Sequence, residues 1–101
     1  MTMQEYQLLG TANSAIRRSD LVAALVEAGW SLSYSEDDEN RLHKGSMRLS
    51  LEGEHTFLIS VKYLGLPDDV SALLSILDKL PMSYSLDLFG DAARLVRRFI
   101  K

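Results

Sequence analysis

The chain has 101 residues, a formal net charge of −3 and no cysteine. This length suits a single domain over residues 1–101, because two independent hydrophobic cores need a longer chain. The absence of cysteine excludes disulfides, thiolate metal sites and cysteine nucleophiles, and the acidic balance argues against a nucleic-acid binder. The sequence shows neither a signal peptide nor an apolar run long enough to span a membrane. We therefore expect a cytoplasmic protein with no membrane span.

The first third of the sequence contains a clear helix signal. Residues 4–9 fit either a short strand or irregular structure. Within residues 19–30, Ser19 is a suitable helix cap, and Gly29 ends the helix because glycine readily takes a positive φ. The apolar side chains of this segment recur at helical spacing and form one stripe: Leu21, Val22, Leu25 and Val26.

Three strands are predicted next. Residues 30–35 alternate apolar residues with serines, which predicts a strand that buries Trp30, Leu32 and Tyr34 on one face. Residues 41–52 read as one strand in which a bulge or bend at Gly45 restores the alternation. A hairpin around Gly53 then leads into residues 55–64, the strongest strand of the chain.

The last third of the sequence predicts a helix, a strand and a second helix. The helix in residues 65–81 has an apolar stripe of leucines and stops at Pro81. Residues 82–89 alternate as a strand with one buried face. Residues 90–101 are expected to be a helix opened by Asp91, with a polar side that carries four cations: Arg94, Arg97, Arg98 and Lys101.

The predicted order is therefore (β)-α-β-β-β-α-β-α. Three consecutive strands joined by short turns favour an antiparallel meander, and the helices supply the apolar stripes that cover it. We expect an α+β domain with a four- or five-stranded, mostly antiparallel sheet and two or three helices packed on one face. The serines of the alternating strands would lie on the uncovered face: Ser31, Ser33, Ser35, Ser83 and Ser85.

The most concentrated feature of the sequence is a run of four acids, namely Glu36, Asp37, Asp38 and Glu39. It does not fit a calcium loop of the EF-hand type, which needs glycine at its sixth position and glutamate at its twelfth. Counted from Asp37, these positions hold Leu42 and Arg48. The run is then either a solvated turn or a negative surface for a basic partner, with Tyr34 as an aromatic anchor beside it.

Catalytic and cofactor signatures are missing from the sequence. His43 and His55 lack the helical i, i+4 spacing of zinc enzymes, and the serines occupy alternate strand positions instead of a nucleophile elbow. No glycine-rich phosphate-binding motif is present. We therefore expect neither an enzyme nor a bound metal or cofactor.

These observations favour a small protein-protein interaction module. In general character the chain is similar to toxin-neutralising immunity proteins and to secretion chaperones, which include small acidic α+β domains. We expect an immunity-type inhibitor of a bacterial toxin whose acidic turn meets a basic toxin domain. Two alternatives stay open: binding of nucleic acid or another anionic surface by the basic C-terminal helix, and a secretion chaperone or small ligand-binding domain. A homodimer formed through that helix or an edge strand also stays open.

Overall fold

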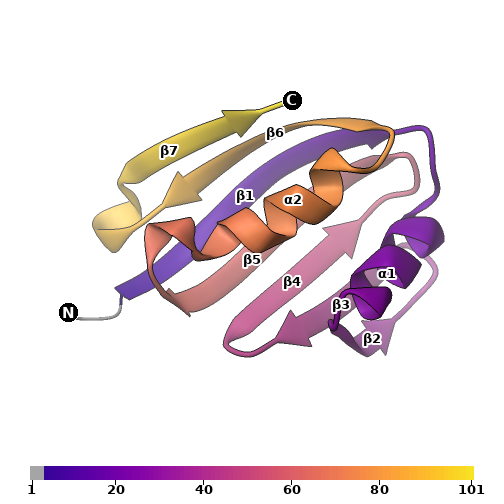
Figure 1. Cartoon of the computed structure of the whole chain (residues 1–101), viewed down its shortest axis with the longest axis horizontal. Coiled ribbons are helices and arrows are strands. Elements are labelled where there is room, and N and C mark those ends of the chain that lie inside the picture. The colour runs from indigo at the N-terminus through magenta and orange to yellow at the C-terminus, as the bar shows by residue number, and fades with distance from the viewer. Residues whose placement is uncertain (1–3) are drawn as a thin grey trace.

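The structure, a computed structural model, describes residues 4–101, which form one antiparallel sheet of seven strands with two α-helices (Figure 1). The strands are β1 (Gln4–Ser14), β2 (Ser31–Ser35), β3 (Glu39–Lys44), β4 (Met47–Glu52), β5 (Thr56–Gly65), β6 (Met82–Phe89) and β7 (Leu95–Ile100). The helices are α1 (Arg18–Glu27) and α2 (Ser71–Asp78), and short 3₁₀ turns occupy η1 (Pro67–Val70) and η2 (Asp91–Ala93). The strands lie in the order β2-β3-β4-β5-β1-β6-β7. The N-terminal strand is thus an interior strand, paired with β5 on one side and β6 on the other.

Both α-helices lie on the same side of the sheet, and the core fills the space between them and the strands (Figure 1). α1 buries Leu21, Val22 and Leu25, whereas Val26 of the predicted stripe is exposed. α2 buries Leu73, Leu74 and Leu77. None of the helices in residues 4–101 is long and apolar enough to cross a lipid bilayer. The strands complete the core with large side chains that include Leu8, Phe57, Ile59, Val61, Leu86 and Leu88.

α1 begins one residue earlier than the predicted cap. Ser19 lies inside the helix, and Asp20 accepts a hydrogen bond from the backbone N–H of Arg17 at 3.2 Å. A carboxylate in the first turn also favours the helix through its dipole. This start places Arg18 at the first helical position with its side chain buried.

The predicted sheet of four or five strands is wrong, because the chain forms seven. One additional strand arises where residues 41–52 divide into β3 and β4. Lys44 pairs with Met47, so Gly45 and Ser46 form a two-residue turn, and Gly45 has a φ of 58°. Glycine favours such a hairpin because it takes positive φ without steric cost. Gly45 therefore reverses the chain instead of bending a single strand.

The predicted C-terminal helix is also wrong, and the segment forms η2 and the edge strand β7. Ala92 and Ala93 have φ values of 55° and 56°, which interrupt a right-handed helix. The apolar residues from Leu95 onward repeat at helical spacing and do not alternate, but the valine, phenylalanine and isoleucine of this segment favour a strand. Backbone hydrogen bonds link Lys101 and Tyr84 in both directions, at 3.0 and 3.2 Å. Pairing with β6 therefore decides the structure of this segment.

β2 does not bury the face that its alternation predicts. Trp30 is buried just before the strand, but Leu32 and Tyr34 are 46% and 39% exposed. The register with β3 shifts between Leu32 and Tyr34, so these two side chains lie on opposite faces. Ser35 consequently lies on the helix side, where its hydroxyl accepts a hydrogen bond from the Asn40 side chain at 2.9 Å. Ser31, Ser83 and Ser85 lie on the uncovered face as predicted.

Candidate functional site on the uncovered face of the sheet

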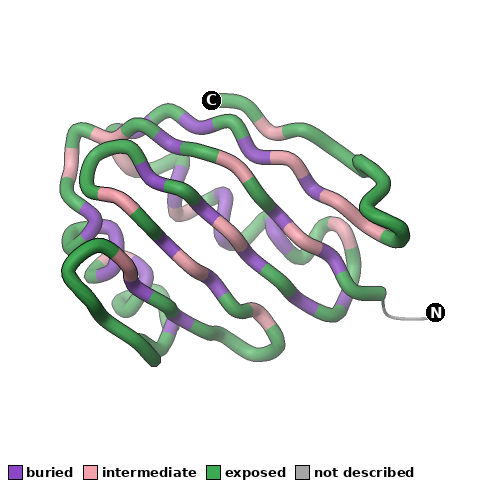
Figure 2. The backbone as a smooth tube through the Cα atoms, turned by 180° about the vertical axis from the view of Figure 1, so that it is seen from behind, coloured by how far each residue is buried: buried purple, intermediate pink, exposed green. Residues whose placement is uncertain are grey.

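The face of the sheet opposite the helices is bare (Figure 2), and we call it the open face. Strand register arranges its side chains in rows that cross the sheet. The acidic row contains Glu39 and Glu52, the middle row contains Arg41, Ser50, Ser60 and Leu9, and the basic row contains His43, Arg48 and Lys62. Charge therefore changes sign along the strand direction, from one end of the open face to the other.

The acidic end of the open face extends into two neighbouring turns. Glu36, Asp37 and Asp38 form the β2–β3 turn, and Glu54 lies in the β4–β5 turn. The backbone N–H of Gly53 donates to the carbonyl of Asp38 at 3.0 Å, which joins the two turns. The acidic run of the sequence is thus part of a larger cluster, to which residues 52–54 add Glu52 and Glu54.

Arg18 holds the two acidic turns together from beneath. Its side chain is buried, and its guanidinium donates to the backbone carbonyls of Asp37 (2.6 Å), Glu36 (3.4 Å) and Gly53. Its Nε donates to the side-chain oxygen of Asn40 at 2.6 Å. The carboxylate of Glu54 is 3.7 Å away, so the buried cation has both hydrogen-bond acceptors and a counter-charge. This arrangement fixes the backbone of the acidic end and leaves the carboxylates of residues 36–38 exposed.

Tyr34 and Glu39 meet at Arg41, which links the acidic row to the middle row. The Arg41 guanidinium lies 4.7 Å from the Tyr34 ring centroid and donates to Glu39 at 2.9 Å. Ser50 also donates to Glu39, at 3.1 Å. The hydrogen bond from Arg41 lowers the pKa of Glu39, whereas desolvation, followed by the charge of Glu36, raises the pKa of Tyr34. Glu39 is therefore already compensated, unlike the other three acids of the run.

The basic row has the opposite character, because its two cations, Arg48 and Lys62, face each other. His43 is paired with Arg48 on the neighbouring strand, and Arg48 with Lys62 on the next. Within residues 4–101, the ion pairs involve Arg18, Arg41 and Arg98 but neither Arg48 nor Lys62. These side chains line a depression of about 650 Å³ together with Tyr34, Arg41 and Ser60. We call it the central depression.

A second depression of about 480 Å³ lies at the far end of the open face, beside η2. Leu9 and Phe89 contribute apolar side chains to it, and Glu5 and Asp91 contribute carboxylates. In the described part of the chain no group of three or more histidine and acidic side chains is close enough to hold a metal ion. His43 and His55 lie at opposite ends of the β3–β4–β5 meander.

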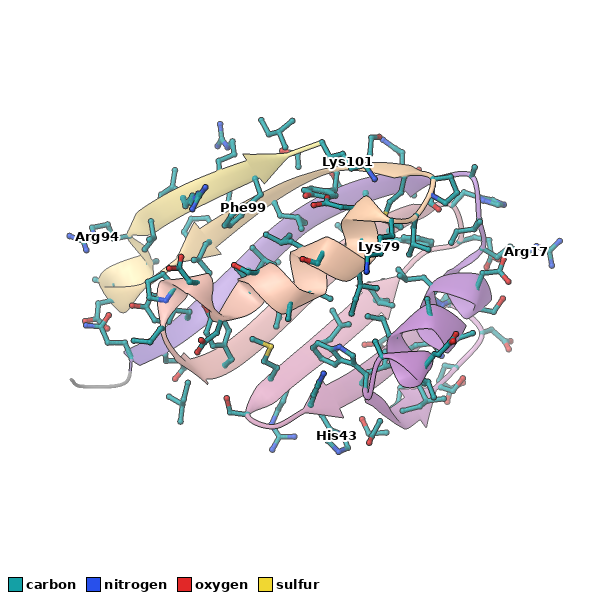
Figure 3. All side chains as sticks on the ribbon, in the orientation of Figure 1. Arg17, His43, Lys79, Arg94, Phe99 and Lys101 are labelled. Atoms are coloured by element: carbon teal, nitrogen blue, oxygen red, sulfur yellow. The ribbon has the colours of Figure 1, made fainter. Side chains whose placement is uncertain are left out.

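The four C-terminal cations do not form the predicted stripe, because β7 distributes them. Arg97 lies over the Phe99 ring at 5.0 Å on the helix side, whereas Arg98 pairs with Asp87 at 2.7 Å on the open face. Lys101 reaches back to the carboxyl end of α2, and its ammonium donates to the carbonyls of Leu77, Asp78 and Leu80 (Figure 3). Arg94 points away at the other end of β7 (Figure 3). A single anionic surface cannot contact all four.

Sequence reasoning missed Arg18, Arg48 and Lys62. Arg48 and Lys62 occupy polar positions of alternating strands, so their common face was readable, but their adjacency depends on the register of two hairpins. Arg18 lies three and four residues before Leu21 and Val22 and extends the buried stripe of α1, but its charge hid this position from a search for apolar spacing. Its partners lie far away in the sequence and gave no local signal.

A scan of protein families, a search of curated proteins and a search of solved structures each found no match to this chain.

Proposed function

We propose that the chain is a protein-binding module that meets a basic partner through the acidic end of its open face. The observation that carries this proposal is the joining of two acidic turns by Arg18 at the rim of a bare sheet. The backbone of the cluster is held in place while its exposed carboxylates stay free to contact a partner. Little conformational entropy is then lost when a partner binds.

The surface beside the acidic turns supports the same proposal. Tyr34 is 39% exposed and stacked by Arg41, so it is a rigid aromatic side chain of the kind that anchors interfaces. Leu58, next to Glu52 in the acidic row, is 56% exposed. An interface needs such apolar contacts at its centre and charged residues at its rim.

Inhibition of a basic toxin domain is the narrower form of the proposal. A nuclease-type toxin carries a positive cleft for its substrate, and an acidic protein of complementary shape would block it. Opposite charges would also accelerate the encounter between the two proteins. Nucleic-acid binding by a basic C-terminal helix is not proposed, because that segment is a strand and its cations are divided between two faces.

The test compares two triple variants that remove the same charge. The first, Glu36→Gln/Asp37→Asn/Asp38→Asn, removes the exposed acids and keeps the carbonyls that Arg18 binds. The control triple, Glu27→Gln/Asp68→Asn/Asp91→Asn, neutralises exposed acids elsewhere. Wild-type protein and each triple are immobilised and incubated with a lysate of the source cell. Any retained basic protein is then purified for measurement of association rates at several salt concentrations.

We expect the wild type and the control triple to retain the same basic protein and the first triple to lose most of it. The association rate for the first triple should be about tenfold slower and nearly independent of salt, because electrostatic steering is removed. Equal association rates for the two triples, with the same salt dependence, would show that the acidic turns do not contact the partner.

A further inference from the structure

The central depression contains like charges in direct opposition. Arg48 on β4 is paired in register with Lys62 on β5, and His43 on β3 is paired with Arg48. Side chains at such positions have Cβ atoms about 4.5–5.5 Å apart, and like charges there destabilise a sheet. In the described residues neither Arg48 nor Lys62 forms an ion pair. A nearby anion would convert this repulsion into attraction.

Uncharged hydrogen-bonding groups border these cations. Ser60 is paired in register with Ser50, and both line the depression. The Ser50 hydroxyl and the Arg41 guanidinium are already directed at Glu39, so the only carboxylate that lines the depression is compensated. The remaining unneutralised charge in the depression is positive.

From this arrangement we propose that the central depression binds a small phosphorylated molecule, with Arg48 and Lys62 as its main contacts. A phosphoryl group carries close to two charges and several acceptor oxygens, so it can contact cations on adjacent strands at once. Arginine suits phosphate because its planar guanidinium donates two parallel hydrogen bonds, and lysine adds a point charge. A volume of about 650 Å³ lies within the range of small-molecule sites. Ser60 is placed to donate a further hydrogen bond.

This site is separate from the proposed protein-binding surface. The basic row lies at the β3–β4 turn, whereas the acidic turns lie at the opposite ends of the same strands. The two proposals rest on opposite charges, carried by residues 36–38 in one case and by Arg48 and Lys62 in the other, although Tyr34 borders both surfaces. Failure of anion binding therefore leaves the interaction through residues 36–38 unaffected, and the reverse also holds.

The experiment uses inorganic pyrophosphate as the probe, titrated into the full chain by isothermal calorimetry at low salt. Lys62→Gln and Arg48→Gln each remove one cation from the row. The control is Arg94→Gln, which removes the same charge from an exposed position at the end of β7. We expect saturable binding of one pyrophosphate, about tenfold weaker in each depression variant and changed less than about twofold in the control.

A second measurement separates binding from folding. Without ligand, Lys62→Gln should melt at a higher temperature than the wild type at low salt, because a repulsive pair is removed, and high salt should abolish the difference. Pyrophosphate should raise the melting temperature of the wild type but not that of Lys62→Gln. The proposal is overturned by either of two results. One is the absence of saturable binding to the wild type, and the other is equal weakening by Lys62→Gln and Arg94→Gln.

Discussion

Replacement of Arg18 by methionine tests the central role of this residue in the acidic end. Methionine fills a similar volume and packs in apolar surroundings, but it donates no hydrogen bond. The carbonyls of Glu36, Asp37 and Gly53 and the side chain of Asn40 would each lose a charged donor. Removal of one partner from a buried charged network costs more than the net value of its bonds, because the remaining polar groups are left unsatisfied.

The expected loss of unfolding free energy is about 3–5 kcal/mol, since a charged hydrogen bond is worth about 1.5–3 kcal/mol and three of the four are only partly buried. The total free energy of unfolding of a domain is about 5–15 kcal/mol, so much of the stability would be lost. With an m-value of about 1.5 kcal/mol/M, the midpoint of urea unfolding should fall by about 2–3 M. Circular dichroism during urea titration measures this midpoint.

Arg17→Met is the matched control, because Arg17 is the preceding residue and its side chain is exposed (Figure 3). Arg17→Met should change the free energy of unfolding by no more than about 0.5 kcal/mol. Arg18→Lys should fall between the two, since it keeps the charge but loses the planar fork of donors. If Arg18→Met shifts the midpoint no more than Arg17→Met, then Arg18 does not hold the two turns together, and the account of the acidic end fails.

Three further substitutions have defined outcomes. Gly10→Ala should destabilise the chain by about 3 kcal/mol or more or prevent folding, because an added Cβ would lie 2.0 Å from the carbonyl oxygen of Ser85. Gly45→Ala should cost only about 1–2 kcal/mol, through its positive φ alone; equal midpoints of urea unfolding for the two variants would contradict this. Burial and a 2.7 Å hydrogen bond to Asp78 raise the pKa of Tyr84 to about 12. Because this pKa exceeds the unfolded value of about 10, stability is fully present below pH 10 and is lost as the pH rises towards 12. Tyr84→Phe should reduce that decline, as measured by urea unfolding at pH 9 and pH 11, and an unchanged decline would refute it.

Both α-helices and two of the interior strands were predictable from local pattern. α1 and α2 follow from apolar spacing, and β5 and β6 from strict alternation. The segment from Leu95 to Ile100 was not predictable from local pattern, because its apolar residues repeat at helical spacing and do not alternate. The segment forms a strand because it pairs with the edge of β6, and this pairing is a long-range interaction. Tyr34 was misplaced for a different reason, since a register shift moved it to the opposite face from Leu32.

The candidate site was predictable only in part. The acidic run is visible in the sequence, but its extension to Glu52 and Glu54 depends on the contact between two turns. The opposition of Arg48 and Lys62 depends on the hairpin that Gly53 permits, with its φ of 108°. A sequence lists charges along the chain, whereas the sheet sets their spacing across strands. The sign reversal along the open face is therefore a property of register.

The interior position of β1 has a consequence for the order of folding. Strands β2, β3 and β4 are each paired with the next strand in the chain, and β6 is paired with β7, so the group β2 to β5 and the group β6 and β7 both form through local hairpins. β1 joins the two groups, and its partners are distant: Leu8 pairs with Val61 and with Leu88. Closure of such long loops is slow. The first of the seven strands to be synthesised is therefore the last to find both neighbours, and until then each group exposes an unpaired edge. Removal of residues 4–14 would separate the meander β2–β5 from the hairpin β6–β7, because β1 is the strand that pairs with both groups.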